Sequence, residues 1–561
     1  MSGTESVKVV IVGGVAGGAS AATRARRCNE DAEIILFEKD EYVSFANCGL
    51  PYYIGGEITE RSKLLVATPE LFKNRFNIDV RTKHLVQSID VEHKSVSVLN
   101  QETGETSTET WDRLILSPGA APIVPPLPGI QAQNVFTLRN LNDTDAIKDY
   151  IESHNCQRAV VVGAGFIGLE MVEQLHHLQM QTDLVELQSQ VLPPLDPEMA
   201  QLIQNELTSH GVKVHLGTAL EKVNVENETA VAVELGNGTT IETDLIILGI
   251  GIAPATGLAK DAGLEIGKSG GISVNEFMQT SCPAIYAVGD AVEYMHGVLM
   301  QPLRIPLAGP ANRAGRIAGQ HAVTGSADPM MSPVGTAIVR VFGLTAAMTG
   351  LSKKLAEKTE CKNRSVIVVP KHHAGYYPGA ESLFLKLTFN PETERVLGAQ
   401  AVGKAGVDKR IDVIATALKF RASIRDLAGL DLAYAPPFGS AKDPVHIAAF
   451  VAGNDLDGLA SIVEVDAELD EYQILDVRTD KEVEDFRFPN IIHIPVDELR
   501  QRLSELDPEK PIVTVCHTAL RAYIATRILK QSGFKDVRNL TGGMLMQRYA
   551  RPELFESNQP G

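Results

Sequence analysis

Two stretches of the chain begin with a short, continuous apolar run and end in a helix-like segment, with a glycine-rich turn between. The first is "VKVVIVGGVAGGASAATRARR" (residues 7–27) and the second is "RAVVVGAGFIGLEMVEQL" (residues 158–175). A run of β-branched and aliphatic residues without polar alternation predicts a strand buried on both faces. The order strand, turn and helix is typical of a parallel sheet covered by helices. The pattern therefore predicts an α/β fold that repeats one design.

Length and composition agree with a chain of several domains. The 561 residues exceed what one hydrophobic core usually serves, so we expect roughly three to four domains. Apolar residues make up 44% of the chain and glycines number 47, which fits a glycine-punctuated α/β enzyme better than a disordered or fibrous protein.

Charge and cysteine usage narrow the class of protein. The formal charge of −18 argues against nonspecific binding to nucleic acid or to an anionic membrane, although a small anionic ligand is compatible with it. The six cysteines are scattered, with no CxxC pair and no spacing typical of a metal site. We see no signal segment and no apolar run of about 18 residues. We expect a reduced, cytoplasmic protein without a metal.

Both glycine-rich turns are candidate dinucleotide sites. The second has all three glycines of the motif, Gly163, Gly165 and Gly168, and Glu186 ends the strand that follows. In the first, Val15 stands where the central glycine is usual, and Glu38 follows the next strand. Such glycines let the backbone approach a pyrophosphate at a helix N-terminus, and the carboxylate binds ribose hydroxyls. A single turn of this kind can be a ligand-free connection, but two with acidic partners favour two dinucleotides. A carboxylate at position 186 repels a 2′-phosphate, which favours NADH over NADPH.

Two further motifs extend the pattern to a family. "LILSPGAAP" (114–122) and "PAIYAVGDAVE" (283–293), together with the two turns, resemble the flavoprotein disulfide reductases over residues 7 to about 450. The resemblance implies one FAD and one NAD(P)H site. The cofactor-binding residues that it implies are Gly13, Gly14, Ala16, Gly17, Gly18, Glu38, Lys39, Asn47, Cys48, Ser117, Pro118, Gly119, Gly163, Gly165, Phe166, Ile167, Gly168, Glu186, Gly251, Gly289, Asp290 and Tyr434.

Cys48 in "SFANCGLPY" (44–52) is a solitary candidate nucleophile. Most of these reductases have a CxxxxC pair, but the positions at that spacing hold Val43 and Tyr53. A single thiolate must react with sulfur from another molecule or with a peroxide. The alternative is a small buried hydrophobe. The segment resembles the SFxxCGxPY signature of coenzyme A-disulfide reductases, in which the cysteine forms a mixed disulfide with coenzyme A.

Two later segments, "HHAGYYPGA" (372–380) and "DLAYAPPFGSAKDP" (431–444), resemble the dimerisation domain of the same group. The resemblance implies a homodimer in which Tyr376 and Tyr434 approach the partner's cysteine, where phenol hydroxyls stabilise a thiolate. A turn with packed aromatic rings is the alternative, and Tyr377 is the adjacent candidate. The coenzyme A-binding residues implied are Ser20, Arg24, Arg27, Ser44, Asn47 and Lys442, although the two arginines, one helical turn apart, also suit a solvated helix face.

A second sulfur site is predicted near the C-terminus. "VCHTALRA" (515–522) places Cys516 at a strand end and Arg521 at a helix start. Loop amides and the positive helix end lower the pKa of such a cysteine and stabilise a persulfide anion. With Asp476 and Arg478 of "DVR", the segment resembles a rhodanese domain over about 95 residues, after an acidic linker. An inactive rhodanese domain that only binds partners is the alternative.

The resemblances together predict two Rossmann-like domains, an α+β dimerisation domain and a rhodanese α/β domain. We expect the first part of the FAD domain at 1–150, the NAD(P)H domain at 151–243, the second part of the FAD domain at 244–330, the dimerisation domain at 331–450, a linker at 451–465 and the rhodanese domain at 466–561.

The implied function is NADH-dependent reduction of coenzyme A persulfide, polysulfide or coenzyme A disulfide through Cys48 and FAD. Cys516 would load sulfur from a donor, and both a small molecule and a sulfur-donor protein remain open for that role. Three alternatives remain: an NADH oxidase or peroxidase with a cysteine sulfenate, a plain coenzyme A-disulfide reductase, and a sulfur-carrier or sensor protein.

Overall fold

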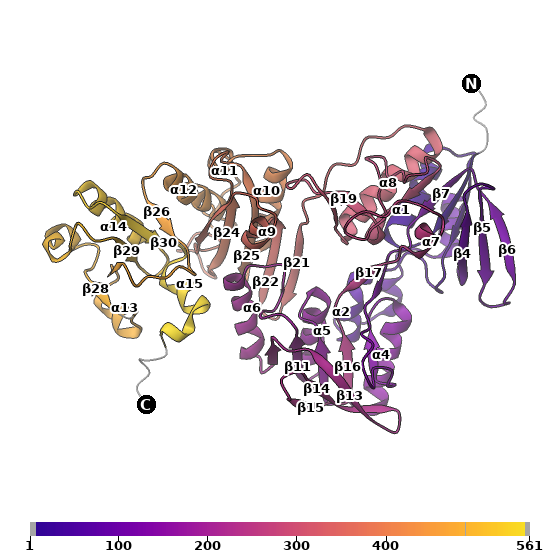
Figure 1. Ribbon diagram of the computed structural model, residues 1–561, viewed down its shortest axis with the longest axis horizontal. Coiled ribbons are helices and arrows are strands. Elements are labelled where there is room, and N and C mark those ends of the chain that lie inside the picture. The colour runs from indigo at the N-terminus through magenta and orange to yellow at the C-terminus, as the bar shows by residue number, and fades with distance from the viewer. Residues whose placement is uncertain (1–6, 489, 556–561) are drawn as a thin grey trace. The chain divides into compact units, whose positions relative to one another are not determined.

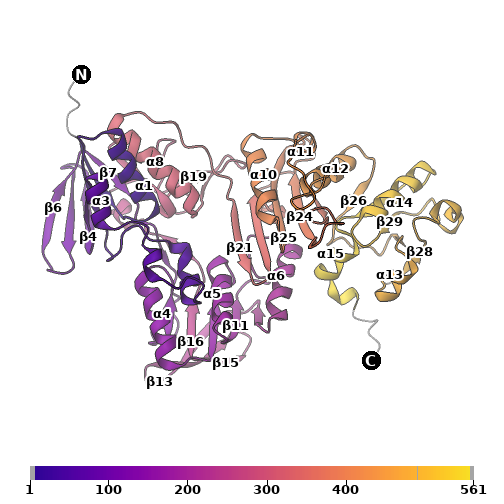
Figure 2. The same ribbon diagram turned by 180° about the vertical axis from the view of Figure 1, so that it is seen from behind.

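The computed structural model describes residues 7–488 and 490–555, and the chain divides into two compact units (Figures 1 and 2). Unit 1 comprises residues 1–187 and 217–335, and unit 2 comprises residues 188–216 and 336–561. Each unit is described by itself below. Among the described residues, no helix is both long and apolar enough to cross a bilayer.

The first glycine-rich turn lies in a parallel five-stranded sheet of unit 1. The strand order is β18 (Ile285–Ala287), β7 (Arg113–Leu116), β1 (Lys8–Val12), β2 (Glu33–Phe37) and β3 (Asp79–Arg81). Apart from β3, whose three residues are half-buried, the strands are almost fully buried, in agreement with their apolar runs.

Helices α1 (Ala16–Cys28) and α8 (Ala308–Thr324) lie side by side in unit 1 (Figures 1 and 2). A Cβ at Gly315 would come within 2.1 Å of the Gly17 carbonyl oxygen, and one at Gly319 within 2.2 Å of the Ala21 carbonyl oxygen. The helices therefore approach so closely that only glycine fits at these two positions.

The second glycine-rich turn lies in another parallel sheet of unit 1. The strands of this sheet that belong to unit 1 are β11 (Gln181–Glu186), β10 (Arg158–Val162), β16 (Leu245–Leu248) and β9 (Val135–Thr137), with α5 (Phe166–His177) after the turn. The predicted boundaries differ here, because β9 falls within residues 1–150 and β16 within residues 244–330. The chain crosses between the two sheets inside those segments, which local sequence does not mark.

Shorter elements complete unit 1. They are α2 (Leu50–Ile54), α3 (Pro69–Phe76), β4 (His84–Asp90), β5 (Ser95–Asn100), β6 (Thr106–Thr110), β8 (Ala120–Pro122), α4 (Leu141–His154), β13 (Leu220–Glu226), β14 (Thr229–Leu235), β15 (Thr240–Glu242), β17 (Ile252–Pro254), α7 (Gly257–Asp261), β19 (Glu293–Met295) and β20 (Pro302–Arg304).

Unit 2 contains an antiparallel five-stranded sheet. The order is β21 (Ala337–Val341), β22 (Leu344–Gly350), β25 (Val396–Gly403), β24 (Leu383–Phe389) and β23 (Arg364–Val368). The helices of this part of the unit are α6 (Pro197–Ser209), α9 (Lys353–Lys358), α10 (Val407–Lys419), α11 (Ile424–Ala428) and α12 (Pro444–Leu456), and the short strand β12 (Lys213–Leu216) follows α6 in the chain.

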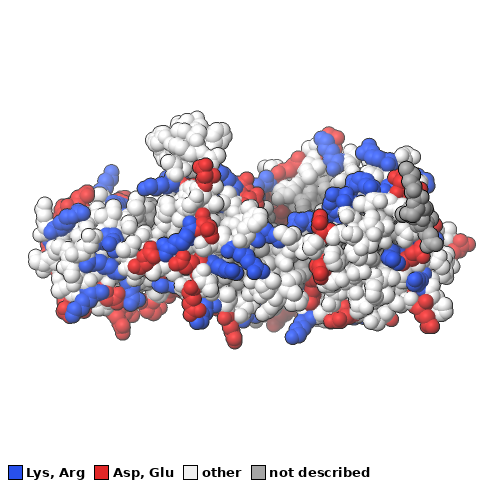
Figure 3. All heavy atoms as spheres, turned by 90° about the horizontal axis from the view of Figure 1, so that it is seen from above, with Lys and Arg blue, Asp and Glu red and all other residues white. Residues whose placement is uncertain are grey.

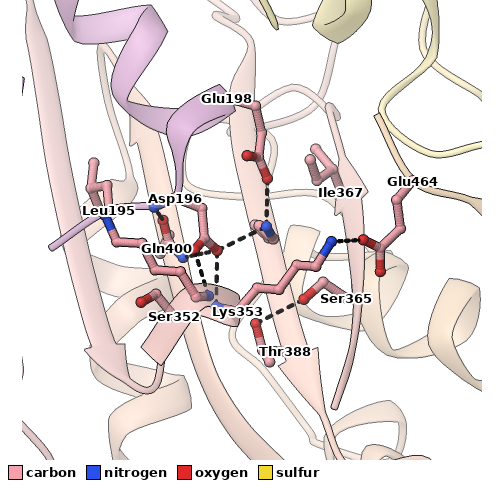
Figure 4. A network of polar contacts seen from close by, with 12 residues as sticks. Leu195, Asp196, Glu198, Ser352, Lys353, Ser365, Ile367, Thr388, Gln400 and Glu464 are labelled. Carbon is pink, nitrogen blue, oxygen red and sulfur yellow. Dashed lines mark hydrogen bonds and ion pairs between the residues drawn. The ribbon is translucent and has the colours of Figure 1, made fainter. Parts of the chain in front are cut away.

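A buried polar network holds the start of α6 to this sheet (Figure 4). Lys386 lies 2.8 Å from Asp196 and also pairs with Glu198, while Gln400 donates to Asp196 at 2.6 Å. Lys353 donates its backbone N–H to Asp196 at 3.0 Å and pairs through its ammonium with Glu464. Buried charges need partners of this kind, so the network fixes residues 196–198 within unit 2.

The C-terminal sheet of unit 2 is parallel. Its order is β26 (Ser461–Val463), β30 (Val537–Leu540), β29 (Ile512–Val515), β27 (Gln473–Asp476) and β28 (Ile491–His493), with helices α13 (Asp480–Asp485), α14 (Leu520–Gln531) and α15 (Gly543–Ala550). Residues 451–465, predicted as a linker, hold the end of α12 and all of β26. β26 pairs with a strand some 75 residues later, and the acidic composition of this segment gave no sign of it.

Backbone hydrogen bonds join the C-terminal sheet to the edge strand β23. Gly542 donates its N–H to the Ile367 carbonyl at 2.9 Å, and the Ile367 N–H reaches the Thr541 hydroxyl at 2.6 Å. An exposed strand edge is thereby covered. On the face that Figure 3 draws, acidic and basic side chains are interspersed.

Candidate active site

The first glycine-rich turn brings the backbone very close to a neighbouring strand end. Gly13 has a φ of 92°, and a Cβ there would lie 2.1 Å from the Ser117 carbonyl oxygen. A Cβ at Gly18 would lie 1.8 Å from the Gly13 carbonyl oxygen, so both positions require glycine. Glu38 accepts a hydrogen bond from the Gly14 N–H at 2.8 Å. The turn, the helix start and the acidic partner therefore form one site, as the spacing predicts.

A cavity of about 370 Å³ opens at this turn. Its lining includes eleven of the residues predicted to bind a cofactor: Gly13, Ala16, Gly17, Glu38, Lys39, Asn47, Ser117, Pro118, Gly119, Gly289 and Asp290. Segments outside the motifs quoted above also line it, among them His84–Val86 and Arg139–Asn140. Nothing local to these residues signals a ligand, because they reach the cavity only through the folding of distant segments.

The donor set of this cavity fits the FAD that the motifs imply. Backbone amides of the turn and the N-terminus of α1 suit a pyrophosphate. The Asn47 side-chain oxygen is buried in the lining without a hydrogen-bond partner among the described residues, so a ligand can satisfy it. Burial raises the pKa of Asp290, and the Arg139 guanidinium at 3.9 Å opposes that shift.

Cys48 follows Asn47 in a single 3₁₀ turn (Asn47–Gly49) just before α2. The residue is exposed, yet the surrounding protein raises the pKa of its thiol, first by desolvation and then through the carboxylates of Glu170 and Asp290. Glu170 also accepts a hydrogen bond from the Tyr52 hydroxyl at 3.2 Å. Within one chain, burial and these two carboxylates therefore favour the thiol of Cys48 over the thiolate.

The sequence analysis missed Glu170, which lies on α5 directly after the second glycine motif. Its contact with Tyr52 joins segments 118 residues apart. The motif marks where α5 begins, whereas the tertiary fold decides what α5 faces.

The second glycine-rich turn repeats the geometry of the first. Gly163 has a φ of 104°, and a Cβ at Gly168 would lie 1.9 Å from the Gly163 carbonyl oxygen. Gly165 is the N-cap of α5, whose first residues are Phe166 and Ile167. Glu186, 8% exposed at the end of β11, accepts the Ala164 N–H at 2.7 Å. Gly251, with a φ of 121°, follows β16 of the same sheet.

The predicted coenzyme A residues of unit 1 have different surroundings. Ser20 donates to the Asn312 side chain at 2.5 Å, and Arg24 is held by Gln320 of α8 at 3.1 Å. Arg27 is exposed. Ser44 has a φ of 51° and donates its N–H to the Gly14 carbonyl at 3.0 Å, which ties the cysteine loop to the first turn. Their role in coenzyme A binding stays a prediction.

Unit 2 brings the two predicted tyrosines together. The hydroxyls of Tyr376 and Tyr434 are 3.1 Å apart, and the residues are 78% and 48% exposed. The hydrogen bond to Tyr434 raises the pKa of Tyr376. Lys442 is exposed in the loop before α12. Two phenol hydroxyls that share a hydrogen bond at the surface suit a function at the surface better than a role in core packing.

The second sulfur site lies where β29 ends and α14 begins. Cys516 is 1% exposed, and its sulfur accepts the Ala522 N–H at 3.4 Å. The N-terminus of α15 also holds the loop, since Met544 donates its N–H to the Cys516 carbonyl at 2.9 Å. Ala519 has a φ of 71°, which a non-glycine residue adopts at a cost. The fold therefore holds this loop in one conformation.

The charged residues of this site form two pairs. Arg478 and Asp476 are fully buried and 2.8 Å apart. Arg521 binds Glu482 through both terminal nitrogens at 2.6 Å, and its charge also interacts with Cys516. The sequence analysis assigned Arg521, Asp476 and Arg478 but missed Glu482, which lies 39 residues before Arg521.

Comparisons with known protein families match three segments of the chain. The pyridine nucleotide-disulphide oxidoreductase family matches residues 7–315, its dimerisation domain matches residues 336–444, and a rhodanese-like domain matches residues 461–545. These matches confirm the predicted fold class and the order of its parts.

Individual relatives cover most of the chain. A coenzyme A disulfide reductase of Staphylococcus haemolyticus is 37% identical over 445 residues, which are 79% of this chain and 99% of the relative. The reduced CoADR-RHD of Bacillus anthracis has a TM-score of 0.94 and 45% identity, covering 98% of this chain and 99% of that chain. An NAD-dependent persulfide reductase from A. fulgidus has a TM-score of 0.91 and 40% identity, covering 96% of this chain and 99% of that chain.

Proposed function

The chain belongs to the pyridine nucleotide-disulphide oxidoreductase family, and on that premise we propose that it is an NADH-dependent reductase of coenzyme A persulfide, polysulfide and coenzyme A disulfide. The observation that carries the proposal is Cys48, an unpaired cysteine beside a dinucleotide cavity, in a chain that also holds a rhodanese-like Cys516 loop. The names of the two relatives that act on coenzyme A disulfide and on persulfide support it.

The residues at the cavity would hold FAD, which supplies two-electron transfer between nicotinamide and sulfur when it is bound. Gly13, Gly17 and the N-terminus of α1 would bind its pyrophosphate, and Glu38 its ribose. Asp290 lies in the lining of the same cavity. Gly163, Gly165, Gly168 and Glu186 would bind NADH in the same manner.

Cys48 performs the covalent chemistry. Its thiolate attacks the inner sulfur of coenzyme A persulfide, the S–S bond breaks, hydrosulfide leaves, and Cys48 is joined to coenzyme A by a disulfide. With coenzyme A disulfide, one coenzyme A thiolate leaves instead. Two electrons from NADH then cleave the mixed disulfide and restore the thiolate and free coenzyme A.

Because burial and nearby carboxylates raise the pKa of Cys48, a hydrogen-bond donor to its sulfur would favour the reactive thiolate. A phenol hydroxyl that donates to a thiolate lowers the pKa of the thiol, and it can protonate a departing thiolate. We propose that the chain is a homodimer in which Tyr376 and Tyr434 donate to Cys48 of the partner subunit, and that Lys442 contacts coenzyme A. The matched dimerisation domain and the exposure of both tyrosines support this assignment.

Cys516 would load sulfur from a donor and transfer it to coenzyme A. The amides around it stabilise a persulfide anion. The donor is a small sulfane compound or a persulfide-bearing protein.

A steady-state comparison of substrates tests the proposal. NADH consumption is measured with coenzyme A persulfide, coenzyme A disulfide, polysulfide and hydrogen peroxide. We expect kcat/KM for the coenzyme A-linked sulfur substrates to exceed that for peroxide by at least about tenfold. Cys48 attacks the sulfur of these substrates directly, whereas peroxide must first oxidise the cysteine to a sulfenate that is then reduced. Faster turnover with peroxide or oxygen would establish an oxidase or peroxidase instead.

A further inference from the structure

The guanidinium of Arg521 is occupied within the chain. Its two terminal nitrogens donate to the two carboxylate oxygens of Glu482, each at 2.6 Å, in a bidentate pair. Planar bidentate pairing uses the edge with which arginine otherwise binds sulfate-like anions. The arginine that faces Cys516 is therefore already neutralised.

The position of Glu482 is set by the fold. It is the third residue of α13 and forms a capping box with Thr479, whose N–H and hydroxyl reach one Glu482 oxygen at 3.1 and 2.9 Å. Its backbone carbonyl accepts a hydrogen bond from the buried Arg478 at 2.9 Å. The Arg521 guanidinium is the first cause that lowers the pKa of Glu482 to about 2, so the carboxylate stays charged at neutral pH.

The charges around the loop leave little net attraction for a dianion. Four charged side chains act on His517, namely Glu482, Arg478, Arg521 and Lys371. Arg478 is paired with Asp476, and Arg521 with Glu482. Lys371 hydrogen-bonds the neutral Ser382 hydroxyl at 3.3 Å. Of these four side chains, Lys371 is the cation without a carboxylate partner described here. Lys371 and the loop amides therefore suit a bound sulfur compound that carries one negative charge.

We infer that Glu482 is a specificity-determining residue for sulfur loading: by holding Arg521 it disfavours dianionic donors such as thiosulfate and reserves Cys516 for neutral or singly charged persulfides. This inference rests on the proposed sulfur loading at Cys516. It narrows the class of donor to organic persulfides, small or protein-bound.

The chemistry balances without an added oxidant. The Cys516 thiolate attacks the outer sulfur of R–S–SH, a new S–S bond forms as the old one breaks, and R–S⁻ leaves. Thiosulfate would instead release sulfite, which keeps two negative charges beside Glu482 during the transfer. The carboxylate thus opposes both the binding of thiosulfate and the departure of sulfite.

The test compares two donors in full-length protein, with cyanide as the sulfur acceptor and thiocyanate as the product. Glu482→Gln removes the charge and keeps a residue that forms capping boxes. We expect kcat/KM for thiosulfate to rise roughly tenfold or more, mainly through KM, while kcat/KM for glutathione persulfide stays within about twofold. Glu484→Gln, which removes an exposed charge from the same helix, should change neither value.

Each other outcome has a distinct meaning. If both donors are used and their ratio is unchanged in Glu482→Gln, or if both values fall together, the inference is wrong while sulfur loading stands. If neither donor loads Cys516 in the unaltered protein or in either variant, sulfur loading itself is refuted.

A measurement on the unaltered protein keeps the inference testable even if the variant does not fold. Sulfate, a dianion shaped like thiosulfate, should inhibit glutathione persulfide turnover only weakly. Inhibition by sulfate below about 1 mM, equivalent to a binding free energy of about −4 kcal/mol, would contradict the inference, because the loop would then bind a dianion well despite Glu482.

Discussion

Glu186 should decide which nicotinamide cofactor the enzyme uses. The residue ends β11 and is 8% exposed, and its carboxylate accepts the Ala164 N–H of the glycine turn at 2.7 Å. A dinucleotide bound at this turn brings the 2′ position of its ribose to the carboxylate. NADH presents a hydroxyl there, whereas NADPH presents a phosphate of like charge.

The magnitude follows from Coulomb's law. Two unit charges about 4 Å apart repel by roughly 1 kcal/mol in bulk water and by about 4 kcal/mol at the effective dielectric of a protein surface. Since about 1.4 kcal/mol corresponds to a tenfold ratio, we expect kcat/KM for NADH to exceed that for NADPH by at least about tenfold.

The perturbation is Glu186→Gln, which removes the charge and keeps an oxygen for the Ala164 N–H. kcat/KM for NADPH should rise about tenfold or more, and kcat/KM for NADH should fall severalfold, because neutral hydrogen bonds to the ribose replace charge-assisted ones. The assay follows NADH and NADPH oxidation with saturating coenzyme A disulfide. Glu226→Gln, at an exposed acidic position of unit 1, is the matched control.

Two results would refute this reasoning. One is equal efficiency with the two cofactors in the unaltered enzyme. The other is a preference that Glu186→Gln leaves unchanged, which would place the discrimination elsewhere on the site.

Three further predictions concern stability, pH and assembly. Lys386→Met should destabilise unit 2 by roughly 3–5 kcal/mol in urea unfolding, because the buried Asp196 and the half-buried Glu198 lose their cation. Lys404→Met, at an exposed ion pair, should change stability by less than about 1 kcal/mol, and similar values for the two variants would contradict the buried-network account. The pKa of Glu482 lies at about 2 in the folded protein and at 4.5 for an unperturbed carboxyl, so its contribution to stability is complete above pH 4.5 and is lost as the pH falls toward 2. Glu482→Gln should therefore lose less stability than the unaltered protein between these pH values. An identical dependence of stability on pH in the two proteins would refute the assignment. Sedimentation should show a dimer, and Tyr376→Phe with Tyr434→Phe should lower kcat with coenzyme A disulfide by about tenfold or more; a fully active monomer would exclude a role for the partner subunit.

Much of the fold was predictable because its signals are local. Continuous apolar runs followed by glycines identified β1, β10 and the helices after them, and Gly13, Gly18 and Gly168 occupy positions where a Cβ would collide with backbone. These signals depend on residues that are neighbours in the sequence, so one amino-acid sequence is enough to detect them. The same holds for Cys516, which directly follows the buried strand β29, as expected.

The features that the sequence did not reveal depend on contacts between distant segments. Arg139 reaches the cavity next to Asp290, some 150 residues later, and Glu170 reaches Tyr52 from the second glycine motif. Glu482 of α13 reaches Arg521 of α14. No sequence motif connects Arg139, Glu170 or Glu482 to the residue that it contacts. For the same reason β26 was expected to be linker, because its pairing with β30 has no counterpart in local composition.

The division of labour between Cys48 and Cys516 is the central claim, and a comparison of two variants tests it most directly. NADH consumption is measured for Cys48→Ser and Cys516→Ser, with coenzyme A persulfide as a substrate that needs no loading and with glutathione persulfide plus coenzyme A as one that does. Losing Cys48 removes the thiolate that attacks sulfur, so both reactions should fall by orders of magnitude, while the visible absorbance of the protein should still respond to NADH. Losing Cys516 should leave reduction of coenzyme A persulfide within about twofold and reduce the coupled reaction at least about tenfold. Loss of coenzyme A persulfide turnover in Cys516→Ser as complete as in Cys48→Ser would contradict the account and would require direct transfer of sulfur between the two cysteines.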